Sequence, residues 1–526
     1  MNTLPAIHVC IVQPMGYVHS LGFLDQSRYL RYQFRRFGAN VTIAKNRLRH
    51  DAVNFVLGAH LGFDPALRQR YSCIFVNLEQ LGDGGASVSK AYMALLQTSA
   101  VVDYDAANVP AYADVLGDVQ IMPLLHAPYL TPTHTLALED RPIDLLFIGS
   151  LNPRRQAIIE RIESTGVQVT VFDHALYGPE RDDFIMQAKA VLNTPFYDSA
   201  RFEQARVSHC LSLGTPVISE RRPMGGHHPA FEQSVTWVDD KQLETFFAKQ
   251  FGTPAYFDDA RAQVAAFREA DPMEAYADLL AFAAGFGQVH QERRPQGAWA
   301  PTLIHLGSGK DYKPGWLNLD VIERAQPDLL LNLAEPLTLP LALESDMVGP
   351  VVIEEGSVDI IHANNVLEHV PDLVTLMSNG LRLLKVGGEF QIEVPYERAL
   401  SAWQDPTHVR AMNENSWVYY TDWFWYLGWF EHRFEVSASS YLDASVNPCG
   451  QDQAAFMRVT LRKIETSLQE RMQARTMQPD LRIPDDEVVC WQPQGADEAE
   501  FEVDAQSAQV PASKAPRSRT AAAVDA

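Results

Sequence analysis

Two glycines and an acid, each placed at the end of an apolar segment, are the residues of this chain with the clearest chemical implication. The apolar run at residues 303–306 ends in Gly307-Ser-Gly309, and a second run at residues 317–319 ends in Asp320. A strand that leads into a glycine turn lets a nucleotide approach the backbone, where a larger side chain would block it. An acid at the end of the next strand can accept hydrogen bonds from two ribose hydroxyls. The spacing therefore predicts a site for a nucleotide cofactor.

The next hundred residues repeat the pattern of an apolar run that ends in polar groups. Residues 328–331 lead to Asn332, and residues 357–363 lead to Asn364. A Gly-Gly pair then precedes the apolar run at residues 389–394. This order of glycine turn, acid, polar strand end and Gly-Gly turn resembles the class I S-adenosylmethionine-dependent methyltransferases. The resemblance extends over roughly residues 300–440.

The resemblance implies a role for each of these positions, and the chain departs from the family at two of them. The residues that would bind S-adenosylmethionine are Gly307 and Gly309 at its methionine part, Asp320 at the ribose, Asn332 at the adenine amine and Asn364 at the sulfonium side. Only residues 310–315 separate the glycine turn from the second strand, so the usual first helix is expected to be reduced or absent, as in one subgroup of the superfamily. Asn332 stands where many relatives have Asp, although an amide oxygen can accept the same bond.

Two histidines are the candidate catalytic residues. Methyl transfer from an activated sulfonium requires little beyond alignment of the reacting atoms, and a general base is needed only if the acceptor is a hydroxyl. His408 lies in a polar loop after the fifth strand, and His369 lies in a Leu-Glu-His sequence. His408 could equally be a loop histidine hydrogen-bonded to Asp405, and His369 a residue that packs at a helix start. Arg410 could hold an anionic substrate or pair with Glu414 at helical spacing.

The N-terminal half alternates apolar strands with helices, which favours parallel sheets wound by helices. The first unit has expected strands at residues 7–13, 40–44, 53–57 and 73–77 and an amphipathic helix at 25–37. The second unit has expected strands at residues 143–150, 167–172, 190–193 and 216–219 and a helix at 201–213. The fold class predicted for the whole chain is therefore α/β, with tandem Rossmann-like units followed by a third, methyltransferase-like Rossmann unit.

Residues 189–220 resemble the donor half of glycosyltransferases with the two-lobed GT-B fold, which place a helix bearing an acid before a Leu-x-x-Gly-x-Pro-Val sequence. The resemblance covers about residues 1–285. It implies that Glu203 binds the donor ribose and that Arg206 meets its diphosphate, with Gly149 and Ser150 beside the same cleft. A solvated helical ion pair between Glu203 and Arg206, in a scaffold that only presents substrate, is the alternative. No metal site is predicted for this half, and His227-His228 is expected to form a turn.

Composition excludes several classes of protein. The net charge of −23 over 526 residues and the lack of a basic stripe argue against a nucleic-acid partner. The five cysteines are far apart without Cys-x-x-Cys spacing, which suggests reduced thiols in a reducing compartment. No apolar run is long enough for a transmembrane segment, and the N-terminus lacks the pattern of a signal peptide, so a cytoplasmic location is expected. The aromatic residues of 417–430 are expected to pack on the third sheet, with peripheral membrane contact as the alternative.

The predicted domains follow from these segments. They are a first lobe at 1–138, a second lobe at 139–285, a Pro- and Gly-containing linker at 286–301, a methyltransferase domain at 302–465 and a C-terminal extension at 466–526. Within the extension a helix is expected at 467–477, and the Ala-, Pro- and Ser-rich tail from about residue 492 is expected to be disordered.

Three hypotheses about function are consistent with these patterns. The first is a methyltransferase that O-methylates a sugar of a surface glycan or glycolipid, joined to a glycosyltransferase-like module that takes a nucleotide sugar. The second directs methyl transfer to a small metabolite or a protein, with the N-terminal half as an inactive scaffold. The third is a non-catalytic assembly protein whose two nucleotide folds have decayed. Binding of S-adenosylhomocysteine and of nucleotide sugars distinguishes the three.

Overall fold

The first lobe contains a six-stranded sheet in which every neighbouring pair of strands is parallel. A computed structural model describes residues 4–113, 119–221 and 226–477. The strand order is β2-β1-β3-β4-β5-β6. The strands are β1 (Ile7–Ile11), β2 (Val41–Lys45), β3 (Val53–Leu57), β4 (Ser72–Asn77), β5 (Ala100–Asp103) and β6 (Gln120–Ile121), and the helices are α1 (Phe23–Arg36) and α2 (Lys90–Gln97). Strands β1, β3 and β4 are buried along their whole length, as both faces of a parallel sheet require.

The second lobe repeats this architecture with five parallel strands in the order β11-β10-β9-β7-β8. The strands are β7 (Ile143–Ile148), β8 (Val169–Phe172), β9 (Ala188–Asn193), β10 (Val217–Glu220) and β11 (Thr236–Val238). The helices are α3 (Pro153–Glu163), α4 (Pro179–Gln187), α5 (Gln204–Ser212), α6 (Leu243–Lys249) and α7 (Pro254–Arg268). The helix expected at 201–213 is shorter, because α5 starts only after Glu203, which lies at its N-cap position.

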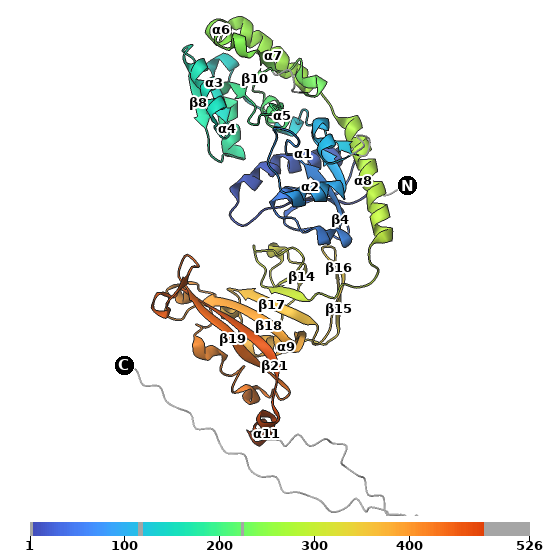
Figure 1. Cartoon of the computed structure of the whole chain (residues 1–526), viewed down its shortest axis with the longest axis vertical. Coiled ribbons are helices and arrows are strands. Elements are labelled where there is room, and N and C mark those ends of the chain that lie inside the picture. Colours follow the sequence, from blue (N-terminus) through green and yellow to red (C-terminus); the bar gives the residue numbers. More distant parts are fainter. Residues whose placement is uncertain (1–3, 114–118, 222–225, 478–526) are drawn as a thin grey trace, which may run out of the picture.

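A 21-residue helix, α8 (Met273–Arg293), returns from the second lobe to the first. It runs along the side of the first lobe toward the C-terminal domain (Figure 1). Tyr276, Leu279, Leu280 and Ala283 follow helical spacing and join the core of the first lobe. The predicted end of the second lobe at 285 and the predicted linker at 286–301 are therefore wrong in part, since residues 286–293 are helical. Of the polar stretch that suggested a linker, residues 291–293 form the exposed end of α8, and the Pro- and Gly-containing residues after 293 follow the helix.

The C-terminal domain has an eight-stranded mixed sheet in the order β14-β13-β12-β17-β18-β21-β19-β20. The five strands β14 to β18 of this order are parallel, and β21 and β19 are antiparallel to their neighbours. The strands are β12 (Leu303–Leu306), β13 (Leu317–Asp320), β14 (Leu329–Leu330), β17 (Val358–Asn364), β18 (Leu384–Pro395), β19 (His432–Leu442), β20 (Pro448–Cys449) and β21 (Phe456–Glu465). The helices are α9 (Leu373–Leu383), α10 (Ser401–Gln404) and α11 (Leu468–Met477). The predicted α/β fold class is confirmed, and the predicted disordered tail lies outside the described residues.

A hairpin that the sequence patterns did not predict, β15 (Leu341–Ser345) with β16 (Gly349–Ile353), projects from the C-terminal domain to the first lobe. The backbone N–H of His50 donates to the carbonyl of Asp346 at the hairpin turn, at 3.0 Å. Arg70 donates to the carbonyl of Val348 at 2.6 Å, and its guanidinium lies 3.6 Å from the centre of the Trp299 ring. The first lobe is thus joined to the C-terminal domain by polar and cation–π contacts as well as by the chain.

A second contact between these parts involves the loop after the glycine turn. The Arg47 guanidinium lies 4.6 Å from the centre of the Tyr312 ring and donates to the carbonyls of Ala325 and Gln326 at 2.7 and 3.0 Å. The Tyr312 hydroxyl donates to Asp328 at 2.6 Å, and both residues are buried. The loop beside the predicted cofactor site therefore contacts the first lobe directly.

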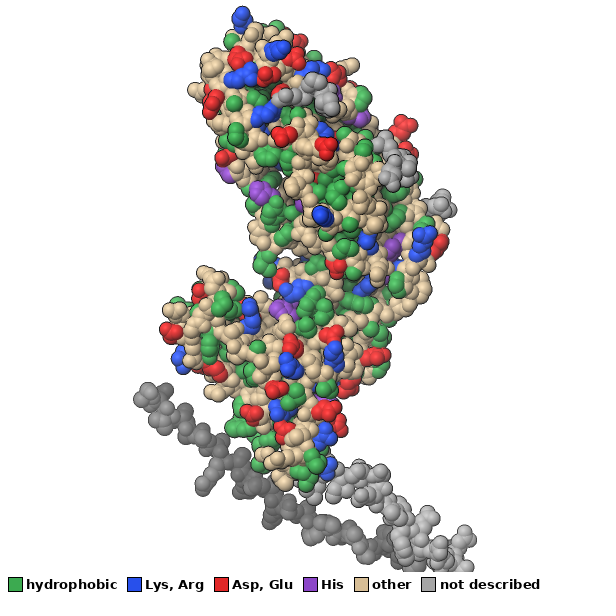
Figure 2. Space-filling model, viewed as in Figure 1, with side chains coloured by type: hydrophobic (Ala, Val, Ile, Leu, Met, Phe, Trp, Pro, Cys, Tyr) green, Lys and Arg blue, Asp and Glu red, His purple; other side chains and the backbone are tan. Residues whose placement is uncertain are grey.

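The aromatic segment at 417–430 divides between core and surface. Trp417 and Phe424 are 2% and 3% exposed and pack in the C-terminal domain, as expected. Trp423 and Tyr426 are 48% and 68% exposed. Within the described residues, no helix has both the length and the apolar character that a membrane span requires. On the face drawn in Figure 2, basic and acidic side chains are interspersed over all three parts of the molecule.

Candidate functional sites

The glycine turn lies where β12 leaves the sheet beside β13, with Ile304 opposite Leu317. Gly307 and Gly309 both have left-handed backbones, with φ of +63° and +46°. One carboxylate oxygen of Asp320 accepts the N–H of Gly309 at 2.8 Å, and the other accepts the N–H of Ile322 at 2.9 Å. Asp320 therefore fixes the turn, and each of its oxygens keeps a lone pair for another donor.

The two glycines face different surroundings. A Cβ added to Gly307 would lie 2.4 Å from a methyl carbon of Val366. Packing against Val366 therefore excludes a side chain at this position, whether or not a ligand is bound. A Cβ added to Gly309 would meet nothing closer than 3.8 Å. The neighbouring Ser308 hydroxyl is buried and has no hydrogen-bond partner among the described residues. Open space at Gly309 and an unpartnered buried hydroxyl beside it fit a turn that receives a polar ligand.

No α-helix separates β12 from β13, as expected from the short connection. Tyr312 fills part of this connection, and Asn318 accepts the N–H of Lys313 at 2.9 Å through its side-chain oxygen. Asn318 also donates to the carbonyls of Lys313 and Trp316, both at 3.0 Å. A buried asparagine therefore orders the loop in place of the helix.

The two asparagines predicted to contact the cofactor have local partners. Asn332 follows β14, where its side-chain oxygen accepts the N–H of Ala334 at 3.0 Å and its amide donates to Glu335 at 3.0 Å. Asn364 is the exposed last residue of β17, and Asn365 donates to its side-chain oxygen at 2.9 Å. Both lie at the carboxyl edge of the parallel strands, where ligands of such sheets bind.

The structure brings the two candidate catalytic histidines together. The rings of His369 and His408 are 4.7 Å apart between centres. His408 contacts the carbonyl of Ala402 through Nδ1 at 3.0 Å, so the expected side-chain bond to Asp405 is wrong; Asp405 instead accepts the hydroxyl and N–H of Thr407. His369 ends a 3-10 turn, Leu367–His369, that precedes α9.

The ion pair of Arg410 with Glu414 is not among the contacts of the described residues, and a role of Arg410 toward an anionic substrate stays a prediction. Its guanidinium donates to the carbonyl of Pro371 at 2.7 Å. Glu414 instead accepts hydrogen bonds from Gln451 at 2.6 Å, Tyr396 at 3.0 Å and Tyr441. Arg410 therefore links the loop after β18 to the loop before α9. Residues 410 and 414 do not lie on one helix, so the pair expected from helical spacing does not form.

A cavity of about 420 Å³ lies between the two N-terminal lobes, and all four residues predicted for a nucleotide sugar line it: Gly149, Ser150, Glu203 and Arg206. From the first lobe, Asp25 reaches Arg181 of the second lobe at 2.6 Å, and His19 reaches Tyr177 at 2.8 Å. The lobes therefore contact each other through polar groups at the cavity.

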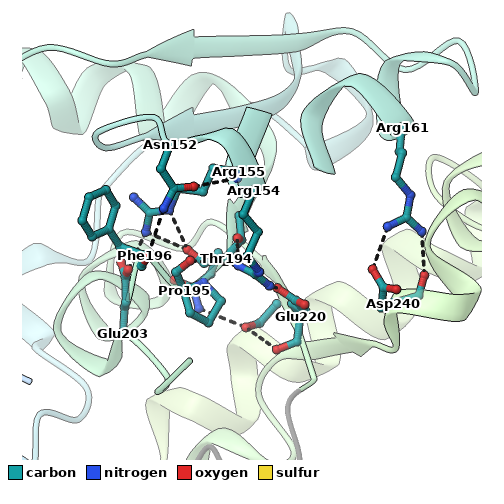
Figure 3. Close-up of polar contacts among 12 residues, drawn as sticks. Asn152, Arg154, Arg155, Arg161, Thr194, Pro195, Phe196, Glu203, Glu220 and Asp240 are labelled. Carbon is teal, nitrogen blue, oxygen red and sulfur yellow. Dashed lines mark hydrogen bonds and ion pairs between the residues drawn. The ribbon is translucent and has the colours of Figure 1, made fainter. Parts of the chain in front are cut away.

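Glu203 is bracketed by two arginines, one of which the sequence patterns did not place in the site. Arg155 donates to one oxygen of Glu203 at 2.5 Å, and Arg206 pairs with the other at 2.6 Å. Arg155 also donates to the carbonyls of Thr194 and Ser150 at 2.7 and 2.8 Å. Figure 3 shows Arg155 beside Phe196 with its guanidinium toward Glu203, and Arg154 directed to Glu220.

The helical ion pair between Glu203 and Arg206, considered as an alternative, does form, with side chains 15% and 27% exposed, and the Arg155 side chain beside it is only 2% exposed. Burial lowers the pKa of its guanidinium to about 10, although Glu203 opposes this effect. A Cβ on Gly149, whose φ is +146°, would lie 3.0 Å from Arg206 and 3.3 Å from Arg155. The glycine therefore makes room for both guanidinium groups at the end of β7. His227 and His228 directly precede the short 3-10 helix Pro229–Phe231, and His227 contacts Glu232 at 2.8 Å; Gly225 lies outside the described residues.

Comparisons with known proteins find similarity in both halves of the chain. The family model described as a methyltransferase domain matches residues 334–392, which include β17 and α9. An uncharacterized protein of Acanthamoeba polyphaga mimivirus, L140, is 26% identical over 165 residues, which are 29% of this chain and 50% of that protein. The chain thus spans about half the length of this curated relative.

Solved structures with similarity to the chain fall into two groups. Anabaena HepE, in a complex with UDP and glucose, is 9% identical over 53% of this chain and all of its own, with a TM-score of 0.37. A SAM dependent methyltransferase from Archaeoglobus fulgidus is 13% identical over 31% of this chain and 86% of its own, with a TM-score of 0.22. Residues 334–392, in the C-terminal part of the chain, thus match a methyltransferase domain, and the N-terminal half consists of two lobes, each built on a parallel sheet.

Proposed function

We propose that the chain is an S-adenosylmethionine-dependent methyltransferase that O-methylates a sugar hydroxyl of a surface glycan or glycolipid. The observation that carries this proposal is the glycine turn held by Asp320, with open space at Gly309 and an unpartnered Ser308 hydroxyl. Gly307, Gly309 and Asp320 would hold the methionine and ribose parts of the cofactor, with Asn332 near the adenine and Asn364 near the sulfonium. When bound, the cofactor supplies a methyl group already activated for transfer.

The residues of the chain then position the acceptor and its proton. His369 and His408 lie after the carboxyl ends of β17 and β18, the edge at which the cofactor would bind. An imidazole nitrogen within reach of the acceptor hydroxyl can take its proton as the oxygen attacks the methyl group. The exposed Trp403 and Trp423 offer apolar faces for a sugar ring or a lipid chain. We place the reaction in the cytoplasm, since buried Cys10, Cys73 and Cys210 are free thiols.

The N-terminal half would supply the sugar part of this function. The cavity between the lobes has a volume in the range of small-ligand sites, and two guanidinium groups lie at its wall. Arginine side chains suit the diphosphate of a nucleotide sugar. In this proposal Glu203 binds the donor ribose and Arg206 binds the diphosphate, with Gly149 and Ser150 beside them.

Calorimetric titration with S-adenosylhomocysteine, followed by a panel of nucleotide sugars, tests the proposal. Micromolar binding of S-adenosylhomocysteine that Asp320→Ala abolishes in a folded protein supports methyl transfer. Binding of a nucleotide sugar that Glu203→Ala weakens supports an active N-terminal half, whereas its absence favours the scaffold hypothesis. If neither ligand binds, the assembly hypothesis replaces this proposal.

A further inference from the structure

Three side chains with metal-ligand chemistry meet beside the glycine turn. Glu368, His369 and His408 each offer one ligand atom, and these atoms all lie within 4.8 Å of one another. Glu368 and His369 come from the 3-10 turn after β17, and His408 comes from the loop after β18. His369 and His408 are 39 residues apart in the sequence, so no short spacing motif predicts this cluster. It lies two residues beyond Val366, whose side chain packs against Gly307.

Hydrogen bonds to the two imidazoles leave one nitrogen of each ring with a free lone pair. The Nδ1 atom of His408 faces the carbonyl of Ala402, which can only accept, so this nitrogen carries the proton. The Thr407 hydroxyl donates to Asp405 at 2.6 Å and therefore accepts from Nδ1 of His369 at 2.9 Å. In the neutral tautomer that these bonds favour, the Nε2 atom of each ring keeps its lone pair. Orienting partners of this kind, on the nitrogen away from the ion, are typical of metal-binding histidines.

Glu368 lacks the partners that a buried carboxylate requires. The residue is 1% exposed, and neither of its carboxylate oxygens has a hydrogen-bond partner among the described residues. A buried carboxylate is costly unless a cation or several donors neutralise it. No side chain among the described residues donates a hydrogen bond to the Glu368 carboxylate, and a cation between it and the two imidazoles would neutralise it.

We propose that Glu368, His369 and His408 bind one first-row divalent metal ion, such as Zn²⁺. Two imidazoles and a carboxylate suit zinc and the late first-row metals better than magnesium or calcium, which prefer oxygen ligands alone. Ligand atoms around a tetrahedral zinc ion with bonds of about 2.1 Å are about 3.4 Å apart. A small movement of the side chains, within the freedom of two partly buried imidazoles, brings the three groups to that separation.

Three protein ligands leave a coordination position open, as in catalytic zinc sites. This step rests on the proposed function: a sugar hydroxyl in that position would lose its proton to water more readily. Its oxygen would then form a bond to the methyl carbon of S-adenosylmethionine while the carbon–sulfur bond breaks and S-adenosylhomocysteine leaves. The imidazoles hold the ion in this scheme, and the ion takes over the activation of the hydroxyl. Thr407 acts as a positioning residue, because it reaches the ion only through His369.

Titration of the metal-free full-length protein with Co²⁺ tests the site without any assay of activity. Visible d–d absorption bands report the coordination of Co²⁺, and competition with Zn²⁺ gives the affinity of the zinc ion. We expect one equivalent of Co²⁺ to bind the wild-type protein. Glu368→Gln and His408→Ala should each weaken binding about 100-fold, and Thr407→Val should weaken it about 10-fold. His134→Ala, which removes an exposed histidine outside the cluster, is the matched control and should bind as the wild type does.

The inference is overturned if the wild-type protein takes up no Co²⁺, or if Glu368→Gln and His408→Ala bind it as tightly as the wild type. Thermal melting of each variant separates loss of the site from loss of the fold, and the isosteric Glu368→Gln is the variant least able to unfold the domain. Titration with S-adenosylhomocysteine on the same sample separates the two proposals. Cofactor binding without Co²⁺ binding refutes only the metal site, and Co²⁺ binding without cofactor binding refutes only the proposed function.

Discussion

Alanine at Gly307 and alanine at Gly309 should have different consequences, although both glycines have left-handed backbones. A Cβ at Gly307 would lie 2.4 and 3.2 Å from the two methyl carbons of Val366, and a Cβ at Gly309 would lie 3.8 Å from its nearest neighbour. The backbone penalty is therefore common to the two substitutions. The steric penalty belongs to Gly307 alone, and it comes from a single β-branched side chain.

The size of the effect follows from these distances. Alanine in a left-handed conformation costs about 1 kcal/mol, and overpacking of a well-filled site costs about 1–3 kcal/mol. Gly309→Ala should therefore lower the free energy of unfolding by about 1 kcal/mol, and Gly307→Ala by about 2–4 kcal/mol. Adding Val366→Ala to Gly307→Ala should recover the steric part, so the double-mutant cycle should give a coupling of about 1–3 kcal/mol.

Urea unfolding, followed by circular dichroism, measures these differences, and titration with S-adenosylhomocysteine on the same variants measures the site. Under the proposed function, Gly309→Ala should weaken binding more than its small effect on stability would suggest, because its new methyl group enters the open side of the turn. Equal destabilisation by the two alanines, or no coupling with Val366, would refute the steric argument.

Three further predictions concern other side chains of the three parts of the molecule. His8 is buried between Thr42 and the carbonyl of Arg47, and burial lowers its pKa from 6.5 to about 4. Between these pH values the unfolded chain therefore binds more protons than the folded chain. The free energy of unfolding should fall by up to about 3 kcal/mol as the pH drops from 6.5 to 4. His8→Asn should reduce this pH dependence, measured by urea unfolding at several pH values. Glu203→Gln leaves the buried Arg155 without its countercharge and should lower stability by about 3 kcal/mol, seen as a lower melting temperature; an unchanged melting temperature would contradict the role of the pair. Tyr312→Phe removes the donor to Asp328 and should cost about 1.5–3 kcal/mol in urea unfolding, with Tyr419→Phe, on the exposed surface, as the control.

The parts of the fold that depend on local sequence could be predicted. The strands at 53–57 and 303–306 form within a residue of their expected bounds, because continuous apolar runs between polar turns leave few alternatives. The missing helix after the glycine turn followed from a count of residues. The return of α8 to the first lobe could not be predicted, since its apolar face fits either lobe by pattern alone.

In the candidate sites, too, contacts between sequence neighbours could be predicted and contacts between distant residues could not. Glu203 and Arg206 are neighbours on one helical turn, so their pairing is local, but Arg155 joins them from 48 residues away. His369 and His408 were candidates one at a time, and only the sheet brings them and Glu368 together. The unpartnered state of the Glu368 carboxylate is a property of its surroundings and has no counterpart in the sequence. Residues that act through tertiary contacts are therefore the ones that sequence patterns missed.

The stacking of Arg47 on Tyr312 has a thermodynamic consequence for the whole chain. Tyr312 belongs to the loop beside the glycine turn, and Arg47 belongs to the first lobe. Suppose that a ligand at the turn and a ligand in the N-terminal half each make this contact more favourable. Each ligand then raises the affinity of the chain for the other, and by reciprocity both affinities rise by the same factor. Ligand binding in the two halves would then be coupled through this contact. A C-terminal fragment cut near residue 300 lacks Arg47, so its affinity for a ligand at the turn would differ from that of the intact chain.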